Sequence, residues 1–175
     1  FKVVEKCAYK FCDLAVVSSN HNNDYIKEKY GLDDNETSVL SNYIDLDLFQ
    51  PNNTVEKVED RVLYVGRLNK EKNLFNLIEA LSQTEYGLDI YGEGVFIANK
   101  LRTFALKHNV SVNFFGVLPN DQIALVYSSY YYYVLPSFHE GMPKTLIEAM
   151  ASGCFCIGTD VPGINEILID GVNGI

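Results

Sequence analysis

From residue 61 onward, short apolar runs alternate with segments of helical periodicity, and this alternation constrains the fold more than any other feature. Between the runs, apolar residues recur with helical spacing, as in Leu74, Leu77, Ile78 and Leu81. Buried strands separated by amphipathic helices are typical of βαβ units. The sequence therefore predicts an α/β fold with a parallel sheet covered by helices on both faces. The expected strands span residues 62–65, 88–91, 112–115, 132–135 and 155–158.

The expected helices of this region have recognisable ends. Asn120 is a plausible N-cap for a helix that carries Ile123, Val126, Tyr127 and Tyr130 on one face. A further helix is expected over residues 145–152, where Gly153 would stop it. Cys154 and Cys156 lie on one face of the last expected strand, so we expect both in the core.

The first 60 residues give weaker patterns. Residues 4, 7, 8 and 11 form the apolar stripe of an amphipathic helix, and residues 14–17 resemble a short strand. A second helix is expected over residues 20–30, with Gly31 after its last turn. A weak strand at residues 39–40 then leads into a Pro- and Asn-rich stretch through residue 54, which indicates a linker or the entry to a domain.

Charge and cysteine content exclude several classes of protein. The chain has 175 residues and a formal net charge of −9, which argues against nucleic-acid or anionic-membrane binding. No apolar run approaches the roughly 18 residues needed to cross a bilayer. Four cysteines are too few for a disulfide scaffold, so a reducing cytoplasm is the default location. Because the chain opens on Phe1 in mid-pattern, we expect a fragment of a longer protein.

The loops that follow the expected strands carry the candidate chemistry, and parallel sheets bind ligands at that edge. The loop 66–72 places Arg67, Lys70 and Lys72 beside Gly66, a set that suits phosphate but also fits a solvated basic loop. Residues 92–94 fit a plain turn, because the third glycine of a dinucleotide fingerprint is missing. No P-loop motif is present, and no cysteine or histidine spacing matches a zinc site.

The segment from residue 136 to residue 150 is the most specific feature. Glu140 lies on a loop, and Glu148 lies eight positions later, inside the next expected helix. The helix N-terminus between them offers free backbone N–H groups and a positive dipole end. Because carboxylates accept hydroxyl hydrogens in pairs, this arrangement suits an anionic centre flanked by hydroxyl-rich groups, such as a sugar diphosphate linked to ribose.

The chain resembles the family-four retaining glycosyltransferases, which are enzymes of the GT-B fold. The resemblance covers most of the chain, and the motifs occur in the same order as in the family. Glu140 and Glu148 match the E-x7-E motif of that family. The other matching segments, each similar to a family motif, are residues 42–51, 64–73, 90–94, 115–118, 140–153 and 161–167. Asn73 departs from the pattern, because the family often has glycine there; we expect this to alter only the start of a helix.

The resemblance implies two Rossmann-like domains, with acceptor mostly on the first and nucleotide-sugar donor on the second. Residues 1–44 would be the end of the acceptor domain and the connection, and residues 45–175 the donor-binding domain without its closing helices, a truncated C-terminal half. In the catalytic roles, Arg67 and Lys72 would hold the diphosphate and Glu140 would contact the transferred sugar. Further donor contacts are implied for Gly66, Leu118 (near the base), Gly141, Lys144 and Thr145 (through backbone N–H groups), Leu146 and Glu148 (to the ribose).

The function implied is transfer of a hexose from a UDP- or GDP-sugar to a glycan or lipid-linked acceptor with retention of configuration. The fragment alone is expected to be inactive. No cofactor and no metal are expected, and no nucleic-acid partner. The resemblance implies a cytoplasmic location. Association with the inner face of the membrane, through contacts of the missing domain, is left open. Two alternatives remain: a non-catalytic nucleotide-binding module, and a glycoside hydrolase that uses the two carboxylates as acid and nucleophile.

Overall fold

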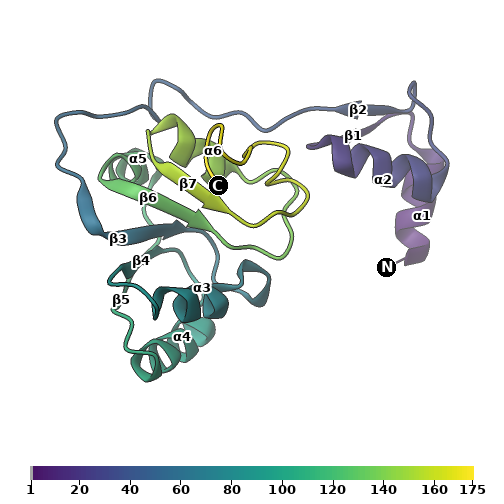
Figure 1. Ribbon diagram of the computed structural model, residues 1–175. Helices are drawn as coiled ribbons and strands as arrows, with labels where there is room; N and C mark the ends of the chain where they lie inside the picture. The colour runs from purple at the N-terminus through teal and green to yellow at the C-terminus, as the bar shows by residue number, and fades with distance from the viewer. Residues whose placement is uncertain (1) are drawn as a thin grey trace.

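A five-stranded parallel sheet forms the centre of the protein (Figure 1), for which a computed structural model describes residues 2–175. The strands lie in the order β5-β4-β3-β6-β7, with every neighbouring pair parallel. Chain order runs outward from β3 to β5 and then returns to the other side of β3. The chain therefore has a topological switch point between β3 and β6, where sheets of this kind bind ligands. The strands are β3 (Val58–Val65), β4 (Gly87–Tyr91), β5 (Val112–Gly116), β6 (Tyr130–Leu135) and β7 (Phe155–Gly158).

Helices cover both faces of this sheet. On one face lie α3 (Leu74–Leu81) and α4 (Val95–Lys107), and on the other lie α5 (Asn120–Ser128) and α6 (Lys144–Ala151), as Figure 1 shows. A single turn of 3₁₀-helix, η1 (Lys70–Lys72), precedes α3. The apolar face of α3 predicted from its spacing is buried, as are Cys154 and Cys156. The predicted α/β fold and its five strands are confirmed.

The beginning of α5 and the end of its apolar face differ from the prediction. Pro119 is the N-cap and Asn120 the first helical residue, with no side-chain cap. Proline has no N–H to satisfy and holds the extended conformation that precedes a helix, so it serves there without a capping side chain. Tyr130 belongs to β6, where it pairs with Val58 of β3. Its helical spacing from Tyr127 is therefore coincidental, because sheet pairing fixes its conformation.

A buried ionic cluster joins four strands at the end of the sheet opposite the candidate loops. Asp89 is 3% exposed and accepts from Arg61 Nε at 2.7 Å, Asn113 Nδ2 at 2.9 Å and Tyr130 Oη at 2.6 Å. Burial raises the pKa of Tyr130, so the phenol stays a donor to the carboxylate. Because each partner lies on a different strand, the cluster fixes the mutual register of β3, β4, β5 and β6.

A small N-terminal unit (residues 2–39) precedes the main sheet. It contains α1 (Lys2–Phe11), β1 (Ala15–Val17), α2 (Asn20–Tyr30) and β2 (Thr37–Val39), and β1 and β2 form a parallel pair of their own. The predicted helix over residues 20–30 is confirmed, and Gly31 follows it with a φ of 73°. An extended connection leads from β2 to β3 (Figure 1). The predicted domain boundary at residue 44 stays a prediction.

Candidate functional site

A cleft of about 320 Å³ opens at the carboxyl ends of β3, β4 and β5 and is closed on its far side by α5 and α6. Among the residues predicted from sequence, five line it: Gly66, Arg67, Leu118, Thr145 and Glu148. Lining residues that the sequence reasoning missed include Tyr91, Asn120 and Ile123. The ring of Tyr91 stacks on Phe115 with the ring centroids 4.6 Å apart, which gives this end of the cleft an aromatic wall.

Two glycine turns form the floor of the cleft. A Cβ at Gly92 would lie 1.8 Å from the carbonyl oxygen of Gly66, so only glycine permits this approach of the two strand ends. Gly66 N–H donates to Tyr91 O at 2.9 Å, and Gly92 N–H donates to Gly116 O at 2.7 Å. The chain bends at Gly92, and Gly92 and Gly94 have the positive φ values expected of the predicted turn. Gly92 and Glu93 also line the cleft, so the interpretation as a plain turn without a ligand contact stays a prediction.

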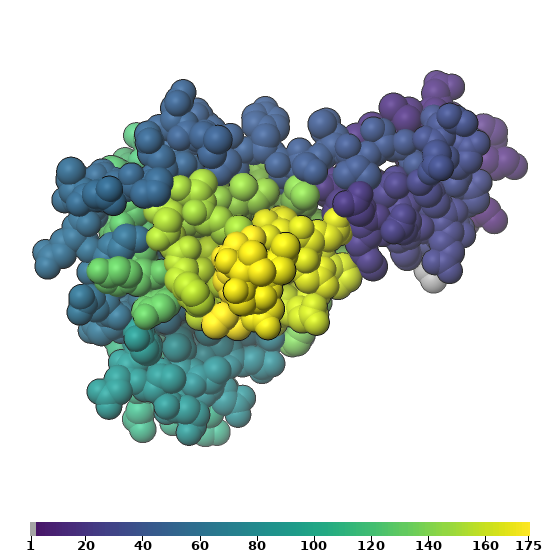
Figure 2. Space-filling model, turned by 45° about the horizontal axis from the view of Figure 1, so that its top comes forward, coloured from purple at the N-terminus to yellow at the C-terminus, as the bar shows by residue number. Residues whose placement is uncertain are grey.

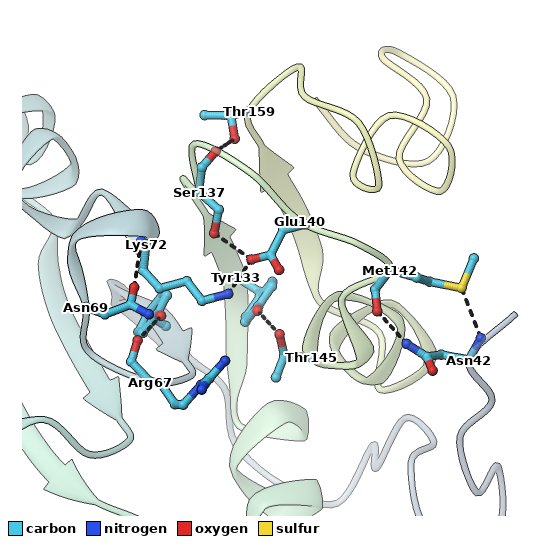
Figure 3. A network of polar contacts seen from close by, with 11 residues as sticks. Asn42, Arg67, Asn69, Lys72, Tyr133, Ser137, Glu140, Met142, Thr145 and Thr159 are labelled. Carbon is cyan, nitrogen blue, oxygen red and sulfur yellow. Dashed lines mark hydrogen bonds and ion pairs between the residues drawn. The ribbon is translucent and has the colours of Figure 1, made fainter. Parts of the chain in front are cut away.

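An ion pair between Lys72 and Glu140 bridges the loops that follow β3 and β6 (Figure 3). Lys72 Nζ lies 2.5 Å from Glu140 Oε1, and the two side chains are only 15% and 11% exposed. Ser137 Oγ donates to the same oxygen at 2.6 Å. The turn that carries Lys72 is held by Asn69, whose side-chain oxygen accepts from the Lys72 N–H at 3.1 Å. Oε1 of Glu140 therefore accepts two hydrogen bonds, one from Lys72 and one from Ser137.

Arg67 and Lys72 are the two cations predicted to hold the diphosphate, and within the described residues only Lys72 has an ion-pair partner. In the described part of the chain, no hydrogen bond or ion pair engages the Arg67 guanidinium, which is exposed and extends toward Thr145 in Figure 3. Its backbone is fixed, because Tyr64 Oη donates to the Arg67 carbonyl at 2.9 Å. Burial raises the pKa of Tyr64, which keeps that donor protonated. A rigid backbone with an unpaired guanidinium suits an anionic ligand.

The N-terminus of α6 faces the same space. Across residues 2–175, the backbone N–H groups of Lys144 and Thr145 have no acceptor, as expected for the first turn of a helix. Tyr133 Oη donates to Thr145 Oγ1 at 2.9 Å, and burial raises the pKa of Tyr133. The Lys144 side chain lies elsewhere, with its Nζ 5.4 Å from the ring centroid of Tyr43. Lys144 can therefore contribute here through its backbone.

Glu148 lies one turn inside α6 and lines the cleft. Tyr127 Oη donates to Glu148 Oε2 at 3.1 Å. Partial burial raises the pKa of Glu148, while the hydrogen bond from Tyr127 and the charge of Lys144 oppose that shift. A carboxylate held this way can accept hydroxyl hydrogens from a ligand in the cleft.

Five predicted residues do not line the cleft: Lys72, Glu140 and Lys144, described above, and also Leu146 and Gly141. The side chain of Leu146 is fully buried in the core, and its N–H donates to Pro143 O at 3.2 Å, so it supports α6 and presents no free group. Gly141 lies on the loop of Glu140, where an added Cβ would be 3.6 Å from Ser18 Oγ and from Asn22 Nδ2. Within residues 2–175, no group of three or more His, Cys, Asp or Glu side chains could hold a metal ion.

Comparison with known proteins identifies the family. Residues 47–175 match the family model described as "Glycosyl transferases group 1". The chain belongs to this family. The O-antigen chain mannosyltransferase RfbU of Salmonella typhimurium is 28% identical over 184 residues, which cover 98% of this chain and 49% of RfbU. The first three curated relatives are matched over only 32%, 35% and 45% of their length.

Solved structures confirm the fold as one half of a GT-B enzyme. Sucrose-phosphate synthase from Thermosynechococcus elongatus superposes with a TM-score of 0.84 at 26% identity, covering 94% of this chain and 45% of that one. Anabaena Alr3699/HepE, solved in complex with UDP and glucose, gives a TM-score of 0.86 at 20% identity, covering 99% and 52%. The group 1 family and the Rossmann-like GT-B architecture predicted from sequence are both confirmed. In the described residues, no helix combines the length and apolarity needed to cross a membrane.

Proposed function

We propose that this group 1 glycosyltransferase chain is the donor-binding half of a retaining hexosyltransferase that uses a UDP- or GDP-sugar and a glycan or lipid-linked acceptor. One observation carries the proposal. The cleft is lined by the unpaired guanidinium of Arg67, by Thr145 in the first turn of α6 with its free N–H group, and by the carboxylate of Glu148. Cations and helix N–H groups bind phosphate, while carboxylates bind vicinal hydroxyls.

The donor would bind in the cleft in one defined orientation. Its diphosphate would lie between Arg67, Lys72 and the N–H groups of Lys144 and Thr145. The ribose hydroxyls would donate to Glu148, which places the base beside Leu118 and the aromatic wall of Tyr91. The sugar would then extend toward Glu140, whose Oε2 has no recorded partner in the described residues and can accept from a sugar hydroxyl.

The chemical role of the site is to stabilise a leaving group. Breaking the bond from the sugar to the diphosphate leaves negative charge on the phosphate oxygens. Tyr64 and Asn69 hold the backbone at Arg67 and Lys72, and the helix holds the α6 N–H groups, so the backbone that carries these groups needs little reorganisation when that charge develops. Glu140 holds Lys72 until the donor arrives and prevents this cation from turning toward solvent.

A UDP-sugar is the first donor to test, because the HepE structure, which has the same fold, holds UDP and glucose. Titration of the chain with UDP, GDP and ADP by isothermal calorimetry should show preference for one of the first two. Lys72→Ala and Glu148→Ala should each weaken that binding at least tenfold. Lys70→Ala is the matched control, because Lys70 lies in the same turn as Lys72 but is exposed and does not contact Glu140.

The outcomes separate the candidate functions. Binding that is lost in both variants and kept in the control supports the site as proposed. Nucleotide binding without any transfer, in a chain extended to the length of its relatives, would identify a non-catalytic nucleotide-binding module. No binding of any nucleotide by the wild-type chain would refute the donor site.

A further inference from the structure

Glu166 makes a contact that the proposed donor site does not use. Its two carboxylate oxygens accept from consecutive backbone N–H groups at the start of α2, Oε2 from Asn20 at 2.8 Å and Oε1 from His21 at 3.1 Å. The partners are separated by about 145 residues in sequence and belong to different parts of the fold. Figure 2 shows atoms of the N-terminal unit (purple) lying against the C-terminal segment (yellow).

Together with Ser19, Glu166 completes the cap of α2. Asn22 N–H donates to Ser19 Oγ at 3.2 Å, and Asn23 N–H donates to the Ser19 carbonyl at 3.1 Å. The first two N–H groups of the helix have Glu166 as their acceptor. A helix N-terminus favours a negative charge, and hydrogen bonds to a charged acceptor are stronger than neutral ones. Half of this cap therefore comes from a distant segment of the chain.

The segment that carries Glu166 also supports the loop of Glu140. Gly163 has a φ of 86°, and an added Cβ there would lie 2.4 Å from the Gly141 carbonyl oxygen and 2.6 Å from the Glu140 carbonyl oxygen. Residues 163–166 thus touch the Glu140 loop at one end and α2 at the other.

Two further contacts bring the N-terminal unit and its connection to the same loop. Gly141 lies beside Ser18 and Asn22, at the beginning of α2. Asn42, in the connection between the units, donates from Nδ2 to Met142 O at 2.6 Å (Figure 3). The Glu140 loop therefore contacts Lys72 through Glu140, the N-terminal unit at Gly141 and the connection at Met142.

We propose that Glu166 is a positioning residue: by capping α2 across the two units, it sets the N-terminal unit against the Glu140 loop. This inference rests on the proposed function only where it concerns catalysis, since the N-terminal unit would then carry the acceptor side. Glu166 does not touch the donor cleft, so its loss should change how the two units are arranged and leave nucleotide affinity unchanged.

A disulfide trap can measure this arrangement. Cysteines introduced by Ser18→Cys and Gly141→Cys would lie close to each other, because a Cβ atom at residue 141 would be 3.6 Å from Ser18 Oγ. Cys7→Ser and Cys12→Ser remove the two cysteines that are not buried. We expect Glu166→Ala to slow formation of the trap at least fivefold. Glu79→Ala, at an exposed glutamate of α3, should leave its rate unchanged.

Hydrogen exchange and nucleotide binding complete the test. In the chain without the trap, Glu166→Ala should accelerate exchange of the Asn20 and His21 amides at least tenfold. Glu166→Gln, which keeps one acceptor oxygen, should give an intermediate rate. The UDP or GDP dissociation constant should stay within twofold of the wild-type value. Unchanged exchange and unchanged trapping in Glu166→Ala would overturn the proposal, whereas absence of nucleotide binding in the wild type would refute only the donor site.

Discussion

Breaking the Lys72–Glu140 ion pair should destabilise the chain measurably, because the pair is largely withdrawn from water. The side chains are 15% and 11% exposed, and Nζ lies 2.5 Å from Oε1. Removing one partner of a fully buried pair costs about 3–5 kcal/mol. The cost should be smaller here, because the pair is not fully buried and Glu140 keeps its hydrogen bond from Ser137. We therefore expect Lys72→Met to lower the free energy of unfolding by about 2 kcal/mol. With a urea m-value of about 2 kcal/mol/M, the midpoint should fall by about 1 M.

A double-mutant cycle isolates the pairwise energy. Glu140→Gln keeps an acceptor for Lys72 and Ser137, so its own cost should be smaller, about 1 kcal/mol. The double variant should cost about as much as Lys72→Met alone, which gives a coupling energy of about 1 kcal/mol. The matched control is Lys27→Met at the surface pair with Asp34, whose side chain is 91% exposed; it should cost less than about 0.5 kcal/mol. A coupling energy below about 0.3 kcal/mol would refute the reasoning from burial.

Three other predictions follow from the structure. Asn73 has a φ of 54°, so Asn73→Ala should destabilise by about 1 kcal/mol in urea unfolding, while Asn73→Gly should not. Burial raises the pKa of Glu148, so its charged form costs stability; Glu148→Gln should raise the Tm at pH 7.5 and weaken nucleotide binding. That gain in Tm should shrink as the pH falls through the raised pKa and the wild-type carboxyl takes up its proton. Arg61→Met leaves Asp89 buried without its cation and should cost about 3 kcal/mol in the same urea assay.

The strands and helices were predictable because each is encoded by neighbouring residues. The bounds of α2, with Gly31 after it, and of β7 agree with the sequence prediction. Where the prediction was wrong, a distant contact decides the conformation: Tyr130 continues a helical spacing but pairs with Val58 in the sheet. Local periodicity cannot show which strand lies beside which, so the order β5-β4-β3-β6-β7 came only from the structure.

The candidate site was predictable in its residue types and not in its contacts. Arg67 and Glu148 line the cleft, as the family resemblance implied, but the hydrogen-bond partners within the site cannot be identified from the sequence. Tyr127 comes to Glu148 from the preceding helix, and Ser137 shares an oxygen of Glu140 with a lysine 68 positions away. Such partners depend on packing between elements, which residue spacing does not report.

Asn73 shows how a departure from a family pattern can be interpreted physically. We expected a change in the start of a helix, and the structure places Asn73 between η1 and α3 in the left-handed region. Glycine adopts that conformation freely, and asparagine is among the few other residues that tolerate it. The requirement at this position is therefore a backbone conformation. This conformation matters to the site because Lys72 immediately precedes Asn73.

The topology explains why the ion pair and the cleft exist together. Lys72 follows β3 and Glu140 follows β6, two strands that are far apart in sequence and adjacent in the sheet. They become neighbours only when α5 carries the chain back across the sheet and β6 pairs on the free side of β3. Before that pairing forms, both charges are in water and the pair contributes little. The free energy that the Lys72–Glu140 cycle measures is therefore gained only once β6 pairs with β3 and the loops of Lys72 and Glu140 meet.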